Sequence, residues 1–392
     1  MSATAISPTN LALIKYWGKR DSVLNLPINS SLSVTLDQND LQTVTTARFG
    51  NARDRLWVNG EEVSLDSVPR TVTVLKEMRG LLSDNDDRKS KPIHIESKNS
   101  FPTAAGLASS AAGYSAMVTA IAGLFGLDFE ARKQELSRIA RRGSGSACRS
   151  LMGGIVAWHM GLSADGSDSQ AEQICEPSHW SNLEAIICVA SDKKKHVSST
   201  SGMQTSVKTS DLLSYRASNV VPNRFRTMRD AIMSRKDSTV FELTMKESNQ
   251  FHACCLDTYP PIFYMTDVSR AVVRAVDGLN GSEHPPKFAY TFDAGPNAVI
   301  FCNKENTKEL LDALLQSFPP SQAELRKDPD FQYVRGRTTM TRAEAEASRT
   351  SGHVDTSGDL LYIFHTGIGQ GARILKGQEE KIYQLTTFEN VE

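Results

Sequence analysis

The sequence has almost no net charge of either sign. Its 44 lysine and arginine residues are balanced by 45 aspartate and glutamate residues. No overall field therefore draws the protein to nucleic acid or to an anionic membrane. We expect no nucleic-acid partner and no membrane partner, and any preference for anions must come from a local site.

Cysteine patterns typical of zinc sites and disulfide scaffolds are missing. The six cysteines form no Cys-X-X-Cys pair and no regular series of spacings, which argues against both kinds of site and for reduced thiols. The first ten residues resemble neither a secretory nor a mitochondrial leader, and the terminal FENVE is not a peroxisomal signal. The expected location is therefore the cytoplasm.

Long apolar runs are scarce. Between Phe101 and Asp128 no residue is charged, and the run meets the bare length of a membrane span. It consists of alanine, glycine and serine rather than leucine, isoleucine and phenylalanine, so its transfer into a bilayer would be weakly favourable. We expect a buried helix here.

The length favours two compact domains, because a single domain holds roughly 100–200 residues. We place them at residues 1–190 and 191–392. The boundary is the polar stretch 191–195, and its lysines Lys193 to Lys195 are interpreted as a solvated linker rather than a binding patch.

Hydrophobic periodicity predicts strands first and a mixture of elements later. Leu32, Val34 and Leu36 alternate with Ser33 and Thr35, a period of two that is typical of half-buried strands. Further strands are expected at 55–58, 92–96, 183–190, 287–292, 297–302 and 360–365, with a turn at 26–29. Helices are expected from 107 to about 125 and at 130–142, 148–151, 224–234 and 241–251. This order predicts an α+β protein, with residues 321–359 the least defined.

A loop of small residues precedes the first long helix. Residues 102–113 read PTAAGLASSAAG, and such a loop exposes backbone N–H groups at the positive end of the helix, where phosphate binds well. No lysine follows Ser109 and Ser110, so this is not a Walker A loop. From the residues alone, a packed alanine-rich helix start is an equally good interpretation.

Three other segments carry candidate site residues. The first, NLALIKYWGKRD at residues 10–21, gathers cations and aromatic rings at the end of a strand. Tyr16 and Lys19 have the reach and the donors to bind a diphosphate. An ordinary amphipathic edge would look similar.

The second segment is RRGSGSACRS, residues 141–150. Ser146 and Arg149 share one face of a helix that begins near Ser144. The planar donors of the guanidinium match the two oxygens of a carboxylate. A surface helix start with a free arginine is the alternative.

The third segment is AYTFDAGPNAVIF, residues 289–301. Asp293 follows an apolar strand and precedes Gly295 and Pro296. An aspartate in this position can simply cap a turn. A carboxylate at a strand end that is shielded from water also has the placement of a general base.

Together these motifs resemble the GHMP kinase superfamily, whose nucleotide loop has the pattern Pro, three residues, Gly-Leu, a small residue and Ser-Ser-Ala. Ala108, where most of those kinases carry glycine, and the preceding Asn99-Ser100-Phe101 are similar to its diphosphomevalonate decarboxylase family. The resemblance covers nearly the whole chain. It implies a two-domain fold, with an N-terminal domain like domain 2 of ribosomal protein S5 and a ferredoxin-like C-terminal domain.

The resemblance also implies roles for individual residues. It assigns catalysis to Asp293, Arg149, Lys15 and Ser110, and it leaves open whether Asp293 removes a proton or only orients a hydroxyl. The implied substrate-binding residues are Tyr16, Trp17, Gly18, Lys19, Arg70, Ser144, Gly145, Ser146, Ala147, Cys148, Arg149 and Thr200. The implied ATP-binding residues are Pro102, Ala105, Gly106, Leu107, Ala108, Ser109 and Ser110. Mg²⁺ is expected with ATP, and Ser110 is its one predicted ligand.

The implied reaction is the ATP-dependent decarboxylation of (R)-5-diphosphomevalonate to isopentenyl diphosphate in isoprenoid and sterol biosynthesis, by a homodimer. One alternative is a kinase of the same superfamily that stops after phosphorylation. A catalytically silent nucleotide-binding protein is the other. The presence of Asp293, Arg149, Ser110 and Lys15 together disfavours the silent protein. The sequence assigns His252 to the interior, as a histidine with satisfied hydrogen bonds.

Overall fold

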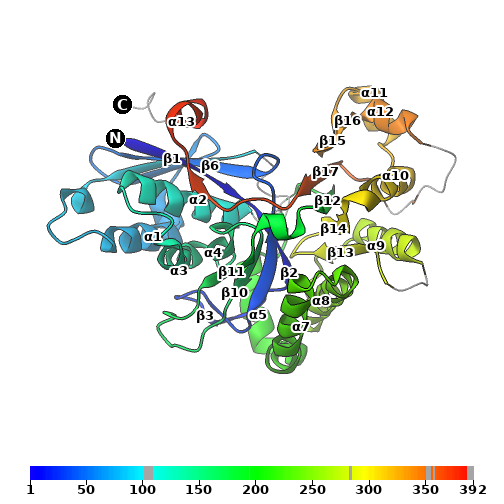
Figure 1. The fold of residues 1–392 in the computed structure, drawn as a ribbon, viewed down its shortest axis with the longest axis horizontal. Coiled ribbons are helices and arrows are strands. Elements are labelled where there is room, and N and C mark those ends of the chain that lie inside the picture. The colour runs from blue at the N-terminus through cyan, green and yellow to red at the C-terminus, as the bar shows by residue number, and fades with distance from the viewer. Residues whose placement is uncertain (101–108, 194, 282–284, 350–354, 356–357, 386–392) are drawn as a thin grey trace.

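The computed structural model describes residues 1–392 except 101–108, 194, 282–284, 350–354, 356–357 and 386–392. Three mixed or antiparallel sheets follow one another across the molecule, with helices packed on their faces (Figure 1). The predicted α+β class is confirmed. Among the described residues, no helix combines the length and the apolar character needed to cross a bilayer.

The first sheet and its helices form one end of the molecule. Its strand order is β18 (Arg373–Ile374), β1 (Ser2–Pro8), β6 (Gln42–Phe49), β9 (Ile93–Asn99), β7 (Arg55–Val58) and β8 (Glu61–Val63). The helices of this end are α1 (Pro69–Gly80), α2 (Ser109–Leu124), α3 (Lys133–Gly143) and α4 (Ala147–Ser150). Helix α2 packs on β1 and β6, and its side chains are mostly buried. The part of the uncharged run that the structure describes, from Ser109 onward, therefore contains the predicted buried helix.

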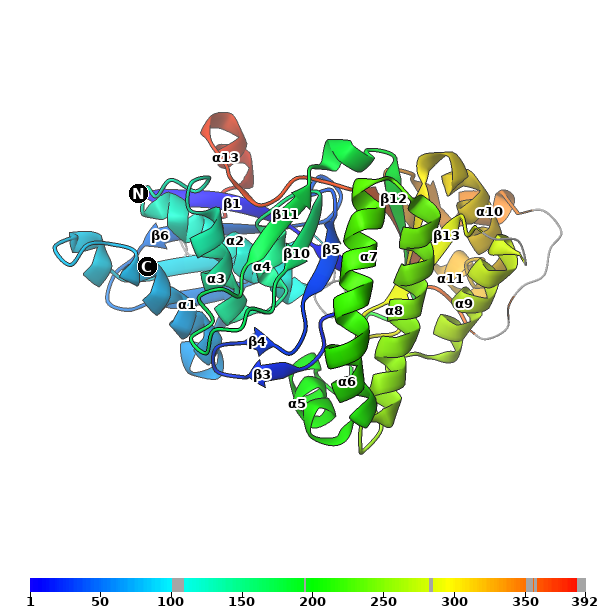
Figure 2. The ribbon, with the colours of Figure 1, turned by 60° about the horizontal axis from the view of Figure 1, so that its bottom comes forward.

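The second sheet lies in the middle. Its strand order is β11 (Ala171–Cys175), β10 (Ile155–Trp158), β5 (Ser31–Thr35) and β2 (Asn10–Ile14). A short ribbon of β3 (Lys19–Asp21) and β4 (Leu26–Pro27) extends from β2, where the sequence predicted only a turn (Figure 2).

Strands β2 and β5 are buried on both faces, so the prediction of half-buried strands is wrong. One face packs in a core shared with β12 (Leu183–Val189) and with helices α7 (Val221–Met233) and α8 (Asp237–Asp257). The polar face is covered by the α4 region: Thr35 Oγ1 donates to the carbonyl of Met152 at 2.8 Å, and Ser31 meets Arg149. The alternation was correct, but both faces have partners.

The third sheet occupies the other end. Its strand order is β13 (Phe288–Phe292), β14 (Ala298–Asn303), β12 (Leu183–Val189), β17 (Tyr362–Gly367), β15 (Gln332–Gly336) and β16 (Met340–Thr341). Its helices are α5 (Ser199–Thr209), α6 (Asp211–Tyr215), α7 (Val221–Met233), α8 (Asp237–Asp257), α9 (Asp267–Asn280), α10 (Thr307–Ser317), α11 (Gln322–Lys327) and α12 (Arg342–Ala347). A π-turn, Arg216–Val220, joins α6 to α7, and α7 runs beside α8 (Figure 2).

The chain crosses between the two ends more often than a single boundary at residue 190 would require. Strand β12, which that boundary assigns to the first half, lies inside the third sheet. Near the C-terminus, β18 pairs with β1, and α13 (Gly377–Tyr383) packs beside the same strand. The shared core and this returning strand connect the two ends, and the cleft between them carries the site.

Candidate active site

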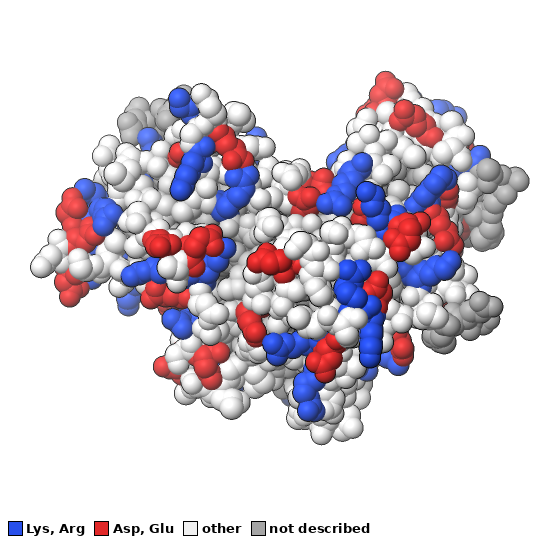
Figure 3. All heavy atoms as spheres, in the orientation of Figure 1, with Lys and Arg blue, Asp and Glu red and all other residues white. Residues whose placement is uncertain are grey.

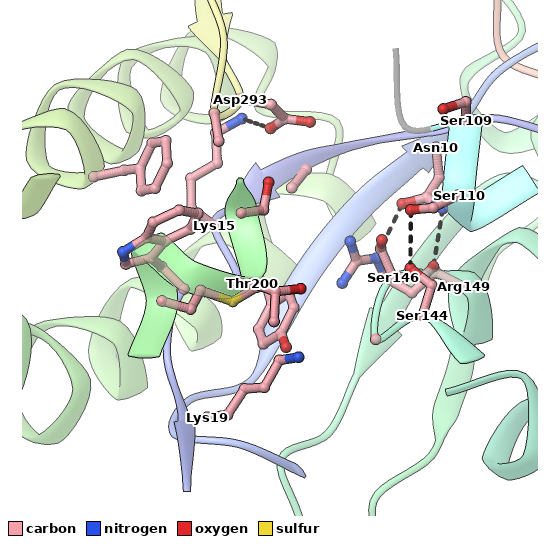
Figure 4. Close-up of a pocket in the computed structure, with 18 of the residues that line it drawn as sticks. Asn10, Lys15, Lys19, Ser109, Ser110, Ser144, Ser146, Arg149, Thr200 and Asp293 are labelled. Carbon is pink, nitrogen blue, oxygen red and sulfur yellow. Dashed lines mark hydrogen bonds and ion pairs between the residues drawn. The ribbon is translucent and has the colours of Figure 1, made fainter. Parts of the chain in front are cut away.

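A cavity of about 380 Å³ lies between the end of β2, the start of α2, the α4 region and the loop after β13. Figure 4 shows its lining side chains converging from both ends of the molecule. The predicted site residues that line it are Lys15, Tyr16, Trp17, Lys19, Arg70, Ser109, Ser110, Ser144, Gly145, Ser146, Arg149, Thr200 and Asp293. Segments more than 270 positions apart thus meet in one place, since Lys15 and Asp293 are separated by 278 positions.

Lys15 and Asp293 form an ion pair in this cavity. Lys15 Nζ lies 2.7 Å from Asp293 Oδ1, with the lysine side chain 3% exposed and the aspartate 35% exposed (Figure 4). Asp293 follows the buried strand β13, and its carbonyl accepts from the N–H of Gly295 at 2.7 Å. The strand end therefore projects a half-open carboxylate into the cavity, and the buried ammonium fixes one of its two oxygens.

His252 lies behind this pair on α8. Burial, and then the charge of Lys15, lower its pKa to about 4, whereas Asp293 acts in the opposite direction. The ring is therefore neutral at physiological pH. The histidine is interior as predicted, but its Nε2 atom has no hydrogen-bond partner among the described residues, so the expectation of a satisfied ring is wrong.

Arg149 is the buried cation of the opposite wall. It is 2% exposed, its Nε donates to Asn10 Oδ1 at 3.2 Å, and its Nη1 donates to Ser31 Oγ at 2.5 Å. Burial lowers the pKa of Arg149, from an ordinary value high enough to leave the guanidinium charged. Two strands thus hold the fork in a fixed direction, which suits recognition of a carboxylate.

Hydroxyl groups surround the start of α2. Ser110 Oγ lies 3.2 Å from Ser144 Oγ, and Asn10 Nδ2 donates to the carbonyl of Ser146 at 3.1 Å. Ser109 and Ser110 begin a helix of 16 residues, so its positive end faces the cavity. The remaining predicted ATP-binding residues, Pro102, Ala105, Gly106, Leu107 and Ala108, lie outside the described residues.

The other end of the cavity collects donors for an anion. The hydroxyl of Tyr16 is buried without a partner among the described residues, and burial raises the Tyr16 pKa, so the group remains a neutral donor. Burial, and then the charge of Arg70, lower the pKa of Lys19 to about 8. Arg70 Nη2 donates to Thr200 Oγ1 at 3.4 Å. An unpartnered hydroxyl beside two cations fits a phosphate group.

Three predicted binding residues do not line the cavity. Cys148 is buried behind the wall, where its Sγ donates to the carbonyl of Gly145 at 3.0 Å, and Ala147 is buried beside it. Gly18 has a φ of +92° and packs against Ile28, a conformation and a space that favour glycine. These residues shape the wall from behind.

The structure adds residues that sequence reasoning missed. Lys195 lines the cavity, and its Nζ donates to Ser199 Oγ at 2.9 Å and to the carbonyl of Ala294 at 2.8 Å. Burial lowers its pKa, so the interpretation of a solvated linker is wrong for Lys195. A run of three lysines gave no signal for this role. Asn10, by contrast, begins the segment NLALIK that the sequence already singled out.

A dedicated metal cage is absent from the described residues, because no group of three or more histidine, cysteine, aspartate or glutamate side chains gathers there. Magnesium in phosphoryl-transfer sites is commonly held by one or two protein groups and by the phosphates themselves. The donors that line the cavity fit that arrangement, with the hydroxyl of Ser110 at the helix start.

The external charge pattern agrees with local rather than global anion binding. Figure 3 shows Lys and Arg interspersed with Asp and Glu over one whole face of the molecule. Positive charge is in excess inside the cavity, where Asp293 is the one acidic side chain among the described residues that line it and the cations are Lys15, Lys19, Arg70, Arg149 and Lys195.

The fold and this cavity define a two-domain protein of the GHMP kinase class. Two family models match the chain: the diphosphomevalonate decarboxylase-like N-terminal domain over residues 7–171 and the mevalonate 5-diphosphate decarboxylase C-terminal domain over residues 185–375. The chain belongs to the diphosphomevalonate decarboxylase family.

Similar proteins agree over nearly the whole chain. A diphosphomevalonate decarboxylase of Ganoderma lucidum is 47% identical over 97% of each chain, and that of Rattus norvegicus is 45% identical over 96% of this chain and 94% of the rat protein. The solved mevalonate diphosphate decarboxylase from Trypanosoma brucei has a TM-score of 0.84 at 34% identity, over 97% of this chain and 99% of its own.

A further structure, described as MDDEF in complex with MVAPP, AMPPCP and magnesium, has a TM-score of 0.75 at 29% identity and covers 96% of this chain and 99% of its own. The likeness to these solved structures confirms the predicted fold.

Proposed function

We propose that this chain is a lyase that converts (R)-5-diphosphomevalonate and ATP into isopentenyl diphosphate, CO₂, ADP and phosphate. The observation that carries the proposal is the position of the Lys15–Asp293 pair, 2.7 Å apart, in one cavity with the buried Arg149. A carboxylate for a hydroxyl, a cation for a carboxylate and donors for a diphosphate are the three functions that this substrate requires. Family membership supports the same activity.

The chemistry explains why ATP is needed. The substrate is a β-hydroxy acid, and no carbonyl is placed to accept the electrons released when CO₂ leaves. Phosphorylation of the C3 hydroxyl makes it a leaving group, and its departure creates positive character at C3. The electrons of the carboxylate bond then form the new double bond, so that CO₂ and phosphate are both released.

Residues on each wall of the cavity have a role in this reaction. Arg149 binds the carboxylate of the substrate and orients it, since Asn10 and Ser31 hold its guanidinium. Asp293 orients the C3 hydroxyl or accepts its proton, and Lys15 fixes the carboxylate for this task. Tyr16, Lys19 and Arg70 bind the remote diphosphate, whose binding energy positions the reacting end.

The positive end of α2 and the hydroxyl of Ser110 face the ATP phosphates in this proposal, together with residues of the 102–108 loop. Lys195 adds a cation beside Asp293. Mg²⁺, when bound with ATP, neutralises phosphate charge, and Ser110 is the protein group that would hold it. The related structure with MVAPP, AMPPCP and magnesium supports this set of ligands.

The finer biological setting is also a proposal. We assign the chain to isoprenoid and sterol biosynthesis in the cytoplasm, and we propose a homodimer, because the family resemblance implies all three. Light scattering of the purified protein tests the dimer, and fractionation of cells tests the location.

Product analysis tests the activity. Purified protein is incubated with diphosphomevalonate labelled at its carboxyl carbon, ATP and Mg²⁺, and the released CO₂ and ADP are counted. We expect equal amounts of both. ADP formation without CO₂, with a stable phosphorylated acid, would establish a kinase that stops after the first step, and neither product would overturn the proposal.

A further inference from the structure

Two consecutive residues of α8 hold the backbone at both members of the reacting pair. Glu247 Oε2 accepts from the N–H of Lys15 at 3.1 Å. Ser248 Oγ accepts from the N–H of Phe292, the residue before Asp293, at 3.0 Å. Glu247 is 0% exposed and Ser248 is 1% exposed, so water does not compete for either bond. One helix therefore connects β2 and β13 at the point where each delivers its charged residue.

Arg216 also contacts the backbone of Lys15. Its Nη2 pairs with Glu247 Oε2 and also donates to the carbonyl of Lys15 at 3.3 Å. The buried ion pair thus contacts both backbone polar groups of Lys15. The carbonyl also accepts from Asn29 Nδ2 at 3.1 Å, and Arg216 Nη1 in turn donates to Asn29 Oδ1 at 3.4 Å. Arg216 opens the π-turn Arg216–Val220, and such single turns occur often at functional sites.

A buried ion pair is a poor means of adding stability. The cost of removing both charges from water offsets most of their attraction, and apolar replacements of similar volume are often equally stable. The Glu247–Arg216 pair contacts Lys15 from both sides. Stability alone therefore does not explain why these two charges lie beneath the cavity.

We propose that Glu247, Arg216 and Ser248 are positioning residues that set the separation of the Lys15 ammonium and the Asp293 carboxylate. None of the three lines the cavity, so they act through the backbone of the reacting pair. The inference rests on the proposed decarboxylase activity and explains how the Lys15 ammonium and the Asp293 carboxylate are kept at a fixed separation. A displacement of about 1 Å can lower a catalysed rate about 100-fold.

The first test compares two single-hydroxyl deletions at the same seam between α8 and β13. Ser248→Ala removes the bond next to Asp293. Tyr290→Phe removes the bond that Asn249 Nδ2 donates to Tyr290 Oη at 3.0 Å. We expect similar falls in the thermal midpoint. Only Ser248→Ala should lower kcat, by about tenfold, with KM for diphosphomevalonate unchanged within about twofold.

The second test replaces the buried pair as a unit. The double variant Glu247→Met with Arg216→Met removes both fully buried charges together. Arg224 loses its carboxylate partner, but its side chain is 22% exposed to water, so we expect the thermal midpoint to be largely retained. Its kcat should fall about 100-fold, because the contacts of Glu247 and Arg216 to the Lys15 backbone are both lost and Asn29 loses its bond from Arg216. The matched control is Arg224→Met, which removes the bond from Arg224 Nη1 to Glu247 Oε1 at 2.8 Å and leaves the Lys15 contacts in place.

Wild-type enzyme is assayed beside every variant for CO₂ release. If the wild type releases none, the proposed function fails. If the wild type is active and both Ser248→Ala and the double variant match their controls in kcat, the positioning role is overturned. Should the double variant fail to fold, the comparison of Ser248→Ala with Tyr290→Phe decides alone, and equal kcat values there overturn the inference.

Discussion

The two walls of the cavity hold their charged side chains in different ways. On the wall formed by β2, β5 and α4, Arg149 is 2% exposed and bonded to two strands. On the opposite wall, Asp293 stands on the loop after β13 with its side chain 35% exposed. The fixed cation suits recognition, which needs one geometry. The open carboxylate suits the role proposed for Asp293, which must be accessible to the hydroxyl of an entering substrate.

The largest effect is expected from a substitution on the wall that carries Asp293. Asp293→Asn keeps the shape of the side chain and removes the charge that, in the proposed reaction, orients or deprotonates the C3 hydroxyl. We expect kcat to fall by about 1000-fold or more, with the fold intact by circular dichroism. The measurement is CO₂ release at saturating substrates. Undiminished turnover would remove Asp293 from the mechanism.

On the wall that carries Arg149, the substitution Arg149→Lys keeps the positive charge and removes the planar guanidinium group. We expect kcat/KM for diphosphomevalonate to fall about 100-fold, because the bonds to Asn10 and Ser31 are not reproduced by an ammonium. The KM for ATP should stay within about twofold.

The matched control for Arg149→Lys is Arg141→Lys. Arg141 is also buried, and its Nη1 donates to the carbonyls of Gly166 and Ser169 outside the cavity. We expect this change to lower stability and leave kcat/KM nearly unchanged. Equal losses in the two variants would show that burial, and not carboxylate recognition, explains the effect.

The pH dependence of substrate binding tests the diphosphate end. Because burial and then Arg70 lower the pKa of Lys19 to about 8, free enzyme loses this cation as the pH rises above that value. The KM for diphosphomevalonate should rise about tenfold one pH unit above it, at constant kcat. Lys19→Arg remains charged and should abolish the rise, and a persistent rise in that variant would assign the titration to another group.

The loss of the Lys19 proton should weaken substrate binding as the pH rises, but it should increase folding stability. Folded Lys19 is neutral above about pH 8, whereas in the unfolded chain it stays protonated up to its ordinary pKa of 10.5. The unfolded state then binds more protons, so the contribution of Lys19 to the free energy of unfolding increases between these values. Lys19→Met should remove that increase in denaturant titrations without substrate.

The smallest effect is expected at Thr200. Thr200→Val removes the oxygen that accepts from Arg70 at 3.4 Å, so Arg70 loses one of its orienting contacts and keeps its charge. We expect KM for diphosphomevalonate to rise about threefold. Thr205→Val is the control on the same helix, because Thr205 Oγ1 donates only to the carbonyl of Ser201 on the exposed side. A tenfold rise would mean that Thr200 itself binds the diphosphate.

Much of the fold was readable from local pattern. The continuous apolar run at 183–190 became β12 (Leu183–Val189), and the helix predicted at 130–142 became α3 (Lys133–Gly143). The short ribbon β3–β4 was missed, since its pairing depends on a partner across a turn. The burial of β5 on both faces was missed as well, because Ser31 and Thr35 look solvent-facing until α4 covers them.

The site residues, too, fall into those that the sequence predicted and those that it did not. The family resemblance pointed to Lys15, Arg149 and Asp293, whereas their residue types and spacing alone left a strand edge, a helix start and a turn cap as alternatives. The structure brings the three into one cavity. Lys195 was missed because lysine runs are usually solvated, and only the packing of the β12–α5 loop against Ala294 buries its ammonium. Glu247 and Arg216 were missed for a related reason: a charged side chain in a helical segment carries no sign of its burial in the sequence.

The sequence by itself determined the family, the mixed α+β class and the residue types of the reacting groups, since these depend on order and spacing along the chain. Only the tertiary structure decided which cationic side chains are desolvated and which carboxylates remain exposed to solvent. That choice depends on contacts between segments up to 278 positions apart, and desolvation, which sets the charge state of Lys19 and His252, is a property of those contacts.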